Sequence, residues 1–268
     1  MERVIYAFGD GVAIAKRNVI KIKRVPEVLV SVLVSPIIFV LLFAYVFGSS
    51  IDIQGGSYRE FLISGIFAMT LVFGATLTGA GLADDMQKGI IDRFRSLPMS
   101  QSAVVFGRTA SDVIYNVLSL IIMTLTGLVV GWRIHNGIGS ALLGFGLLLL
   151  FAYAFSWIMA YVGLLVPSVE VINNASFVVV FPLTFIANTF VPAENLPTPL
   201  RIFAEWNPVS AVTQASRELF GNIPPGTPEP TAWPLQNAVL YTLIWVVIII
   251  AIFAPLAVRR YKRARARS

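Results

Sequence analysis

Six stretches of this chain are long and apolar enough to cross a membrane as helices. Asp112 is the only charged residue within them. They cover residues 28–50, 61–83, 111–132, 138–166, 171–191 and 232–258. A helix needs about 20 apolar residues to span a hydrocarbon core of about 30 Å. Since only 13% of the chain is charged and 57% is hydrophobic, we predict an all-α integral membrane protein with six transmembrane helices, and a water-soluble domain is excluded.

Positive charge predicts how these helices are oriented. Sixteen of the 20 Lys and Arg residues lie in regions 1–27, 84–112 and 259–268, and four lie in the alternate loops. Because Lys and Arg collect in short cytoplasmic loops, we expect a multi-pass protein of the cytoplasmic membrane with both termini inside. The net charge of +6 then reflects orientation and contact with anionic membrane lipids, and a nucleic-acid partner is not expected.

Residues 1–25 carry a helical pattern ahead of the first span. Apolar residues recur at spacings of three and four, and basic residues fall on the opposite side. We predict an amphipathic helix that lies in the inner membrane interface. Pro26 breaks this helix before the chain turns into the membrane. The apolar residues are Val4, Phe8, Val12, Ala15, Val19 and Ile22.

The segment 192–231 is too long for a simple turn between two spans. Pro208 suits the first turn of a helix and Gly221 suits its end. We therefore predict short extracellular helices before the last span, one of them running from Pro208 to Phe220. Its apolar face, which includes Val209, is expected to rest on the outer membrane boundary.

A charged stretch between the second and third spans predicts a short cytoplasmic helix over residues 84–98. Asp84 and Lys88 are spaced for an ion pair one turn apart, and Pro98 ends the helix. Apolar residues repeat every three or four positions, which gives an edge that suits a groove on a soluble partner. They are Met86, Ile90, Phe94 and Leu97.

The same stretch carries a family resemblance. The run from Lys88 to Ser100, followed by Gly107 and Arg108, resembles the cytoplasmic-loop signature of type 2 ABC transporter permeases, nearest to the daunorubicin-resistance branch. The segment from Asn195 to Gly221 is similar to the outer region of that family. Together with the six spans, the resemblance covers essentially the whole chain, 1–268, as one transmembrane domain.

The resemblance implies an exporter of a lipophilic compound, which would be a drug, an antibiotic or a lipid. Two copies of a separate ABC ATP-binding subunit would bind ATP and Mg²⁺, and a second permease, a copy or a homologue, would complete the complex. Residues 1–25 would be the connecting helix and 84–98 the coupling helix that docks into the ATPase. The docking residues implied are Met86, Lys88, Gly89, Ile90, Asp92, Arg93, Phe94, Arg95, Leu97 and Pro98.

The residues themselves agree that this chain is a transport subunit and not an enzyme. A G-x-x-x-x-G-K-[ST] phosphate loop does not occur, so we expect no cofactor on this chain. With no cysteine and one histidine, neither a thiolate nor a histidine-based metal site is expected. Aromatic residues of the second and fifth spans are candidates for the cargo path, or else they pack against helices or lipid. They are Phe67, Phe73, Phe177, Phe181, Phe185 and Phe190.

Two alternatives stay open from the sequence alone. An ion-coupled secondary transporter normally carries ionisable residues inside its spans, and here Asp112 lies only at a cytoplasmic end. An intramembrane lipid-modifying enzyme is suggested by the pair Asp84 and Asp85. The position three beyond Asp85 is Lys88, however, so a second carboxylate at the expected spacing is missing.

Overall fold

The structure is a computed structural model that describes residues 26–46, 57–91, 101–223 and 226–263, and within these ranges its regular structure is helical, without strands. This agrees with the all-α prediction. Four helices are long and apolar enough to cross a membrane, and two more are apolar but shorter. The four are Tyr58–Gln87, Val104–Val130, Gly137–Gly163 and Ala238–Arg263, and the shorter two are Val34–Val46 and Val169–Phe185.

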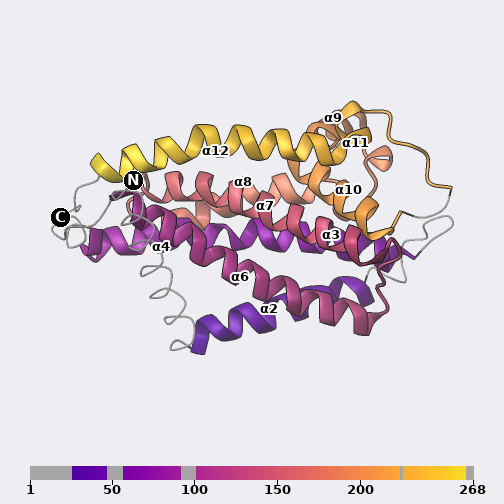
Figure 1. Ribbon diagram of the computed structural model, residues 1–268, viewed down its shortest axis with the longest axis horizontal. Helices are drawn as coiled ribbons and strands as arrows, with labels where there is room; N and C mark the ends of the chain where they lie inside the picture. The colour runs from indigo at the N-terminus through magenta and orange to yellow at the C-terminus, as the bar shows by residue number, and fades with distance from the viewer. Residues whose placement is uncertain (1–25, 47–56, 92–100, 224–225, 264–268) are drawn as a thin grey trace.

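The helices of the bundle run roughly along the long axis of the molecule, with α3 and α4 placed end to end (Figure 1). They are α2 Pro26–Val46, α3 Tyr58–Gly74, α4 Thr76–Gln87, α6 Gln101–Val130, α7 Gly137–Gly163, α8 Val169–Phe185 and α12 Ala238–Arg263. Helix α2 packs on α6 at one edge, and α12 packs on α7 at the other. Helix α7 also contacts α4, α6 and α10, so it lies at the centre of the bundle.

Helices α3 and α4 together form one apolar rod with a break in the middle. Helix α3 ends at Gly74 and α4 begins at Thr76. The Thr76 hydroxyl donates to the Phe73 carbonyl over 2.7 Å, a contact that satisfies a carbonyl where the helical bonding changes. Side chains from Phe61 to Met69 are all buried, which makes α3 the most enclosed helix of the bundle.

Helices α4 and α7 approach each other closely where both carry glycine. A Cβ atom added at Gly163 would clash with the Gly79 carbonyl oxygen, and one added at Gly79 would lie 2.6 Å from the Met159 carbonyl oxygen. Small residues permit such backbone contact between helices in membranes. The crossing therefore depends on glycine at both positions.

Short helices cluster at the end of the molecule where α3 begins and α6 ends (Figure 1). They are η1 Ala193–Asn195, α9 Thr198–Trp206, α10 Pro208–Phe220 and α11 Trp233–Gln236. We refer to this as the outer end and to the opposite one as the inner end. Helix α10 has the bounds expected from sequence, since the Asn207 side chain caps Val209 over 2.9 Å and Gly221 closes it at a φ of 74°.

The apolar face of α10 does not rest on the membrane boundary as expected. Val209, Val212 and Phe220 are buried, and α10 packs against α3, α7 and α12. Gly144 on α7 opens the space for this packing, because a Cβ there would meet the Phe220 ring at 2.8 Å. Helix α10 is therefore part of the protein core.

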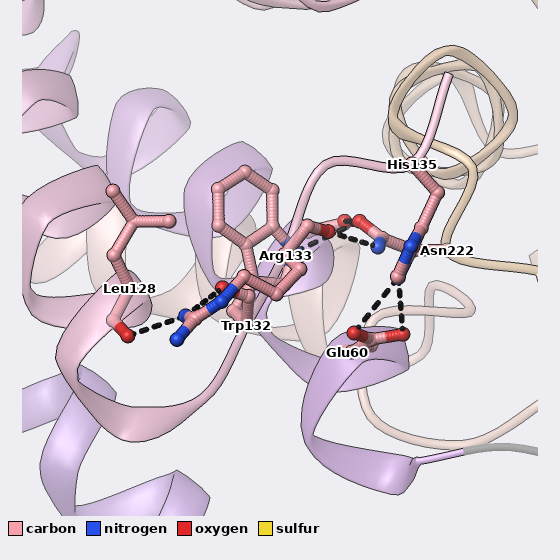
Figure 2. Close-up of polar contacts among 7 residues, drawn as sticks. Glu60, Leu128, Trp132, Arg133, His135 and Asn222 are labelled. Carbon is pink, nitrogen blue, oxygen red and sulfur yellow. Dashed lines mark hydrogen bonds and ion pairs between the residues drawn. The ribbon is translucent and has the colours of Figure 1, made fainter. Parts of the chain in front are cut away.

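An outer polar cluster, formed by Glu60, Trp132, Arg133, His135 and Asn222, closes the outer end (Figure 2). The Trp132 indole Nε1 donates to Asn222 Oδ1 over 2.8 Å, and Asn222 Nδ2 donates to the Arg133 carbonyl over 2.8 Å. His135 Nε2 lies 3.0 Å and 3.2 Å from the two carboxylate oxygens of Glu60. These contacts tie the α6–α7 connection to the start of α3 and to the end of α10.

Candidate functional site

A groove of about 460 Å³ opens among α2, α3, α4, α6 and α8. Cavities of roughly 300–1,000 Å³ are typical of small-molecule sites. Aromatic side chains are the largest group in its lining, and the other lining residues are uncharged, some apolar and some polar. The aromatic residues are Phe39, Phe43, Phe73, Tyr115, Phe177, Phe181 and Phe185.

The α8 wall of the groove is a stack of phenylalanine rings. Phe177 and Phe181 have ring centroids 4.9 Å apart, and Phe181 and Phe185 are 4.0 Å apart. Their spacing of four residues puts the rings one above the other on one face of the helix. Phe190, which follows the end of α8, continues the stack at 4.7 Å from Phe185.

The stack continues onto the first apolar helix. The Phe43 ring of α2 lies 4.7 Å from Phe190, and Phe39 lies 5.6 Å from Phe43. We call this continuous row the aromatic ladder. It runs, in spatial order, through Phe39, Phe43, Phe190, Phe185, Phe181 and Phe177. The ladder joins two helices, α2 and α8, that lie far apart in the sequence.

Helix α6 supplies the polar side of the groove. Asn116 and Ser119 line it, and Gly74 makes room for Asn116, since a Cβ at Gly74 would lie 2.7 Å from Asn116 Oδ1. One turn further toward the inner end, Asp112 is buried. Uncharged hydrogen-bonding groups therefore face the aromatic ladder across the groove.

The charges nearest the groove are paired among themselves. Asp112 accepts a hydrogen bond from Thr78 on α4 and lies 3.8 Å from Arg108 Nε. Arg108 Nη2 also donates to the Leu77 carbonyl over 2.8 Å. These contacts satisfy the carboxylate inside the bundle, and they attach α6 to α4 just inside the α3–α4 break.

The inner end of α4 carries the first of the docking residues expected from sequence. Helix α4 ends at Gln87, and Gly89 has a φ of 65° before a new helical stretch begins at Ile90. Gly89 adopts the left-handed conformation that glycine tolerates. The expected continuous helix over 84–98 is therefore interrupted here. Lys88 is exposed and pairs with Asp84 at 2.8 Å.

Met86 points into the protein. It is 7% exposed and packs in an inner core with Leu82, Ile91 and Trp157. Other docking residues expected from sequence, and the helix over 1–25, lie outside the described residues. These docking residues are Asp92, Arg93, Phe94, Arg95, Leu97 and Pro98.

Residues 11–220 match the family described as ABC-2 type transporter. The chain belongs to the ABC-2 type transporter family. It is 32% identical over 250 residues, 93% of this chain and 85% of the relative, to the daunorubicin resistance ABC transporter permease protein DrrB1 of Streptomyces coeruleorubidus. It is 22% identical over 237 residues, 88% of this chain and 82% of the relative, to the probable doxorubicin resistance ABC transporter permease protein DrrC of Mycobacterium tuberculosis.

A third relative matches a smaller part of the chain. The putative transport permease ycf38 of Porphyra purpurea is 22% identical over 214 residues, 78% of this chain and 73% of the relative. The chain is thus a multi-pass membrane protein and the non-catalytic permease subunit of an ABC transporter. The family resemblance read from the sequence is confirmed.

The structure of the ABC-2 permease brings five of the six candidate cargo-path residues together. Phe73, Phe177, Phe181 and Phe185 line the groove, and Phe190 lies in the aromatic ladder. Phe67 does not belong to this site. It is 0% exposed and packs against Trp132, Phe145 and Phe220 near the outer end.

Helical geometry explains why Phe67 and Phe73 separate. Six residues turn a helix by roughly 600°, which leaves the two side chains about 120° apart. Phe39 and Phe43 of the ABC-2 permease, by contrast, were missed from sequence. Their spacing of four repeats the spacing found in α8, and that signal was present in the first apolar stretch.

Proposed function

We propose that this permease is the membrane part of an ATP-driven exporter that moves a lipophilic compound, and that the groove is part of the cargo path. The observation that carries the proposal is the aromatic ladder. It lines a groove of about 460 Å³ whose described lining residues include no charged side chain. Aromatic faces bind flat or apolar groups well, and Asn116 and Ser119 can orient a neutral polar group of the cargo.

The names of two relatives indicate which class of compound to test as cargo. Two of them are named for resistance to daunorubicin and to doxorubicin. A drug or antibiotic of this lipophilic kind fits the aromatic wall, and so does a lipid. We therefore take daunorubicin as the first test compound.

The proposed topology has six spans with both termini in the cytoplasm. The shorter apolar helices, Val34–Val46 and Val169–Phe185, would complete the four long ones, and the whole chain would form one transmembrane domain. Residues 192–231 would then be extracellular. The placement of Lys and Arg supports this orientation.

The proposed complex takes its energy from another subunit. Two copies of an ABC ATP-binding subunit would hold ATP and Mg²⁺, and a second permease, identical or homologous, would pair with this one among the membrane lipids. Residues 84–98 would form the docking region and residues 1–25 the connecting helix. The interruption at Gly89 would separate the docking part, from Ile90 onward, from the rod above it.

A displacement of the docking region at the inner end would be transmitted to the groove through α4. This helix runs from Gln87 to Thr76, and Phe73 of the groove wall lies just beyond the break. Arg108 and Asp112 attach α4 to α6 at the same level. A displacement of α4 therefore moves the Phe73 wall relative to the aromatic ladder on α8 and α2.

The test is ATP-dependent daunorubicin uptake into inverted membrane vesicles that contain the chain and a co-produced ABC ATP-binding subunit. Phe181→Ala should lower uptake about tenfold, because it removes the central ring of the α8 stack. Val179→Ala is the matched control on the same helix, since Val179 is 64% exposed and lies outside the groove lining. Its uptake should match wild type.

Equal uptake by Phe181→Ala and Val179→Ala would remove the groove from the cargo path. Uptake that persists without the ATPase and follows a proton gradient would overturn the exporter itself and favour the ion-coupled carrier.

A further inference from the structure

A second cavity, the outer cavity, lies among η1, α10, α11 and the chain on either side of them, and it differs in character from the groove. Its volume is about 620 Å³, within the usual size of a ligand site. Its lining mixes charged and amide side chains with proline and other apolar residues. This composition is unsuited to a purely lipophilic molecule.

Arg217 on α10 is the most buried charge of the outer cavity wall. It is 1% exposed, and its guanidinium lies 3.4 Å from the centre of the Phe61 ring. Nε donates to the Phe61 carbonyl over 2.9 Å and Nη2 donates to the Thr189 carbonyl over 3.0 Å. Burial lowers the pKa of Arg217 to about 9, so the side chain stays positive at neutral pH.

One nitrogen of this guanidinium has no partner. Nη1 of Arg217 is buried and makes no hydrogen bond. A buried donor on a charged group without an acceptor is costly, and natural structures leave few of them. Since Arg217 lines the outer cavity, an acceptor oxygen brought by a ligand would supply the partner that this nitrogen lacks.

Carboxylates face the same cavity. Glu194, Glu218 and Glu229 line it, and Glu194 is close enough to act electrostatically on Arg217. Asn188, also in the wall, has a buried Oδ1 without a hydrogen-bond donor. The cavity therefore offers one cationic donor for an acceptor, and several acceptors for a donor that carries positive charge.

We propose that the outer cavity binds a zwitterionic head group in which an anionic oxygen meets Arg217 and an ammonium group meets Glu194 and Glu218. Three carboxylates against one guanidinium repel a purely anionic ligand. A purely cationic ligand would leave Arg217 Nη1 unpaired. A neutral hydroxyl-rich ligand would satisfy the hydrogen bonds but not the carboxylate charges.

Helix α9 indicates that the head group belongs to a lipid. It packs against η1 and α11, which line the outer cavity, and it exposes Ile202, Phe203 and Trp206. An exposed apolar face that ends in tryptophan is typical of a helix at a membrane interface. An acyl chain can lie along this face while the head group enters the cavity. Phosphatidylethanolamine is the common lipid class with this chemistry.

The outer cavity is connected to the aromatic ladder through residues 188–190. Thr189, whose carbonyl is held by Arg217, directly precedes Phe190 of the aromatic ladder. Asn188 next to it lines the cavity. A bound head group would therefore fix the backbone that carries one ring of the ladder.

The test uses the purified full chain in detergent and short-chain lipids as probes. Diheptanoyl phosphatidylethanolamine should bind at least tenfold more tightly than the phosphatidylglycerol analogue, with a matching rise in Tm. The phosphatidylcholine analogue should bind in between, because its trimethylammonium group is positive but cannot donate hydrogen bonds. Free phosphoethanolamine should bind weakly, because it has no acyl chain.

Glu194→Gln is the informative variant, since Arg217 also supports the fold through two backbone carbonyls. Glu194→Gln should reduce the preference for phosphatidylethanolamine over phosphatidylglycerol to less than threefold. Glu170→Gln, an exposed carboxylate in the first turn of α8, is the control and should retain the full preference. Arg217→Lys should weaken binding of both lipids, if it folds.

Equal binding of phosphatidylethanolamine and phosphatidylglycerol by wild type, or an unchanged preference in Glu194→Gln, would overturn the proposal. A rise in Tm with free phosphoethanolamine as large as that with the lipid would overturn the part of the proposal that requires an acyl chain. Neither result depends on an ATPase or on cargo transport, so the exporter proposal stands or fails separately.

Discussion

At the scale of single residues, the crossing of α4 and α7 depends on Gly79 and Gly163. We expect Gly163→Ala to destabilise the chain by about 1–3 kcal/mol, because the new methyl group meets the Gly79 backbone and overpacks the contact. Thermal unfolding in detergent measures this. Gly146→Ala on the same helix is the control, since a Cβ there meets nothing within 4 Å, and it should be neutral or slightly stabilising. An equal loss of Tm in both variants would contradict the requirement for glycine at the crossing of α4 and α7.

Asn222 holds the outer polar cluster together, and its removal tests how much the cluster contributes. Asn222→Ala leaves the buried Trp132 indole N–H and the Arg133 carbonyl without partners, so we expect a loss of about 1–3 kcal/mol in thermal or denaturant unfolding. His135→Gln changes an exposed contact to Glu60 and should cost less than about 0.5 kcal/mol. A larger loss of stability in His135→Gln than in Asn222→Ala would show that the contact between His135 and Glu60 contributes more than the hydrogen bonds of Asn222.

The burial of Arg217 was difficult to predict from sequence patterns alone. Arg217 is one of the four basic residues outside the predicted cytoplasmic regions, and the sequence assigned it no role of its own, yet it is buried in the protein. A hint was available, because Arg217 lies four residues after Thr213 and three before Phe220, on a face of α10 that is otherwise buried. The direction in which that face points, however, depends on α3 and α7, and no local pattern specifies it.

At the scale of the elements, the end of α4 offers a test of coupling. Gly89→Val places a β-branched residue in a left-handed conformation, which costs about 1–2 kcal/mol locally, although a Cβ there meets nothing within 4 Å. We expect ATP-dependent transport to fall several-fold, with a loss of Tm no larger than that of Gly163→Ala. Gly89→Asn, which tolerates this conformation, should retain transport. Normal transport by Gly89→Val would show that this turn does not transmit motion.

Helix bounds were predictable where the signals are local. Pro208 and Gly221 specify the ends of α10 through fixed backbone geometry and capping, and both ends agree with the structure. The break between α3 and α4 was not predictable from local signals, because the sequence has no proline there. The aromatic ladder was predictable in α8 from its spacing of four, but its continuation onto α2 is a tertiary contact.

At the scale of the whole molecule, orientation in the membrane is open to direct measurement. The chain contains no cysteine, so single cysteines can be introduced without further changes. Glu229→Cys in the outer loop should react with a membrane-impermeant maleimide in intact cells, whereas Lys88→Cys at the inner end should react only after permeabilisation. The unmodified chain is the control for background labelling. The opposite pattern would invert the proposed topology.

The outer polar cluster also has a consequence for biosynthesis. Asn222 bonds to Ser64 and to Trp132, which precede it by 158 and 90 residues. At a synthesis rate of about 5–20 residues per second, roughly 5 to 18 s pass between the synthesis of Trp132 and that of Asn222, which accepts its hydrogen bond. Until then the outer end of the first half of the nascent chain lacks this hydrogen bond, and we expect proteases of membrane quality control to cleave it more readily. Cellular yield of variants in this cluster should therefore follow the speed of translation between residues 132 and 222 as well as their final stability.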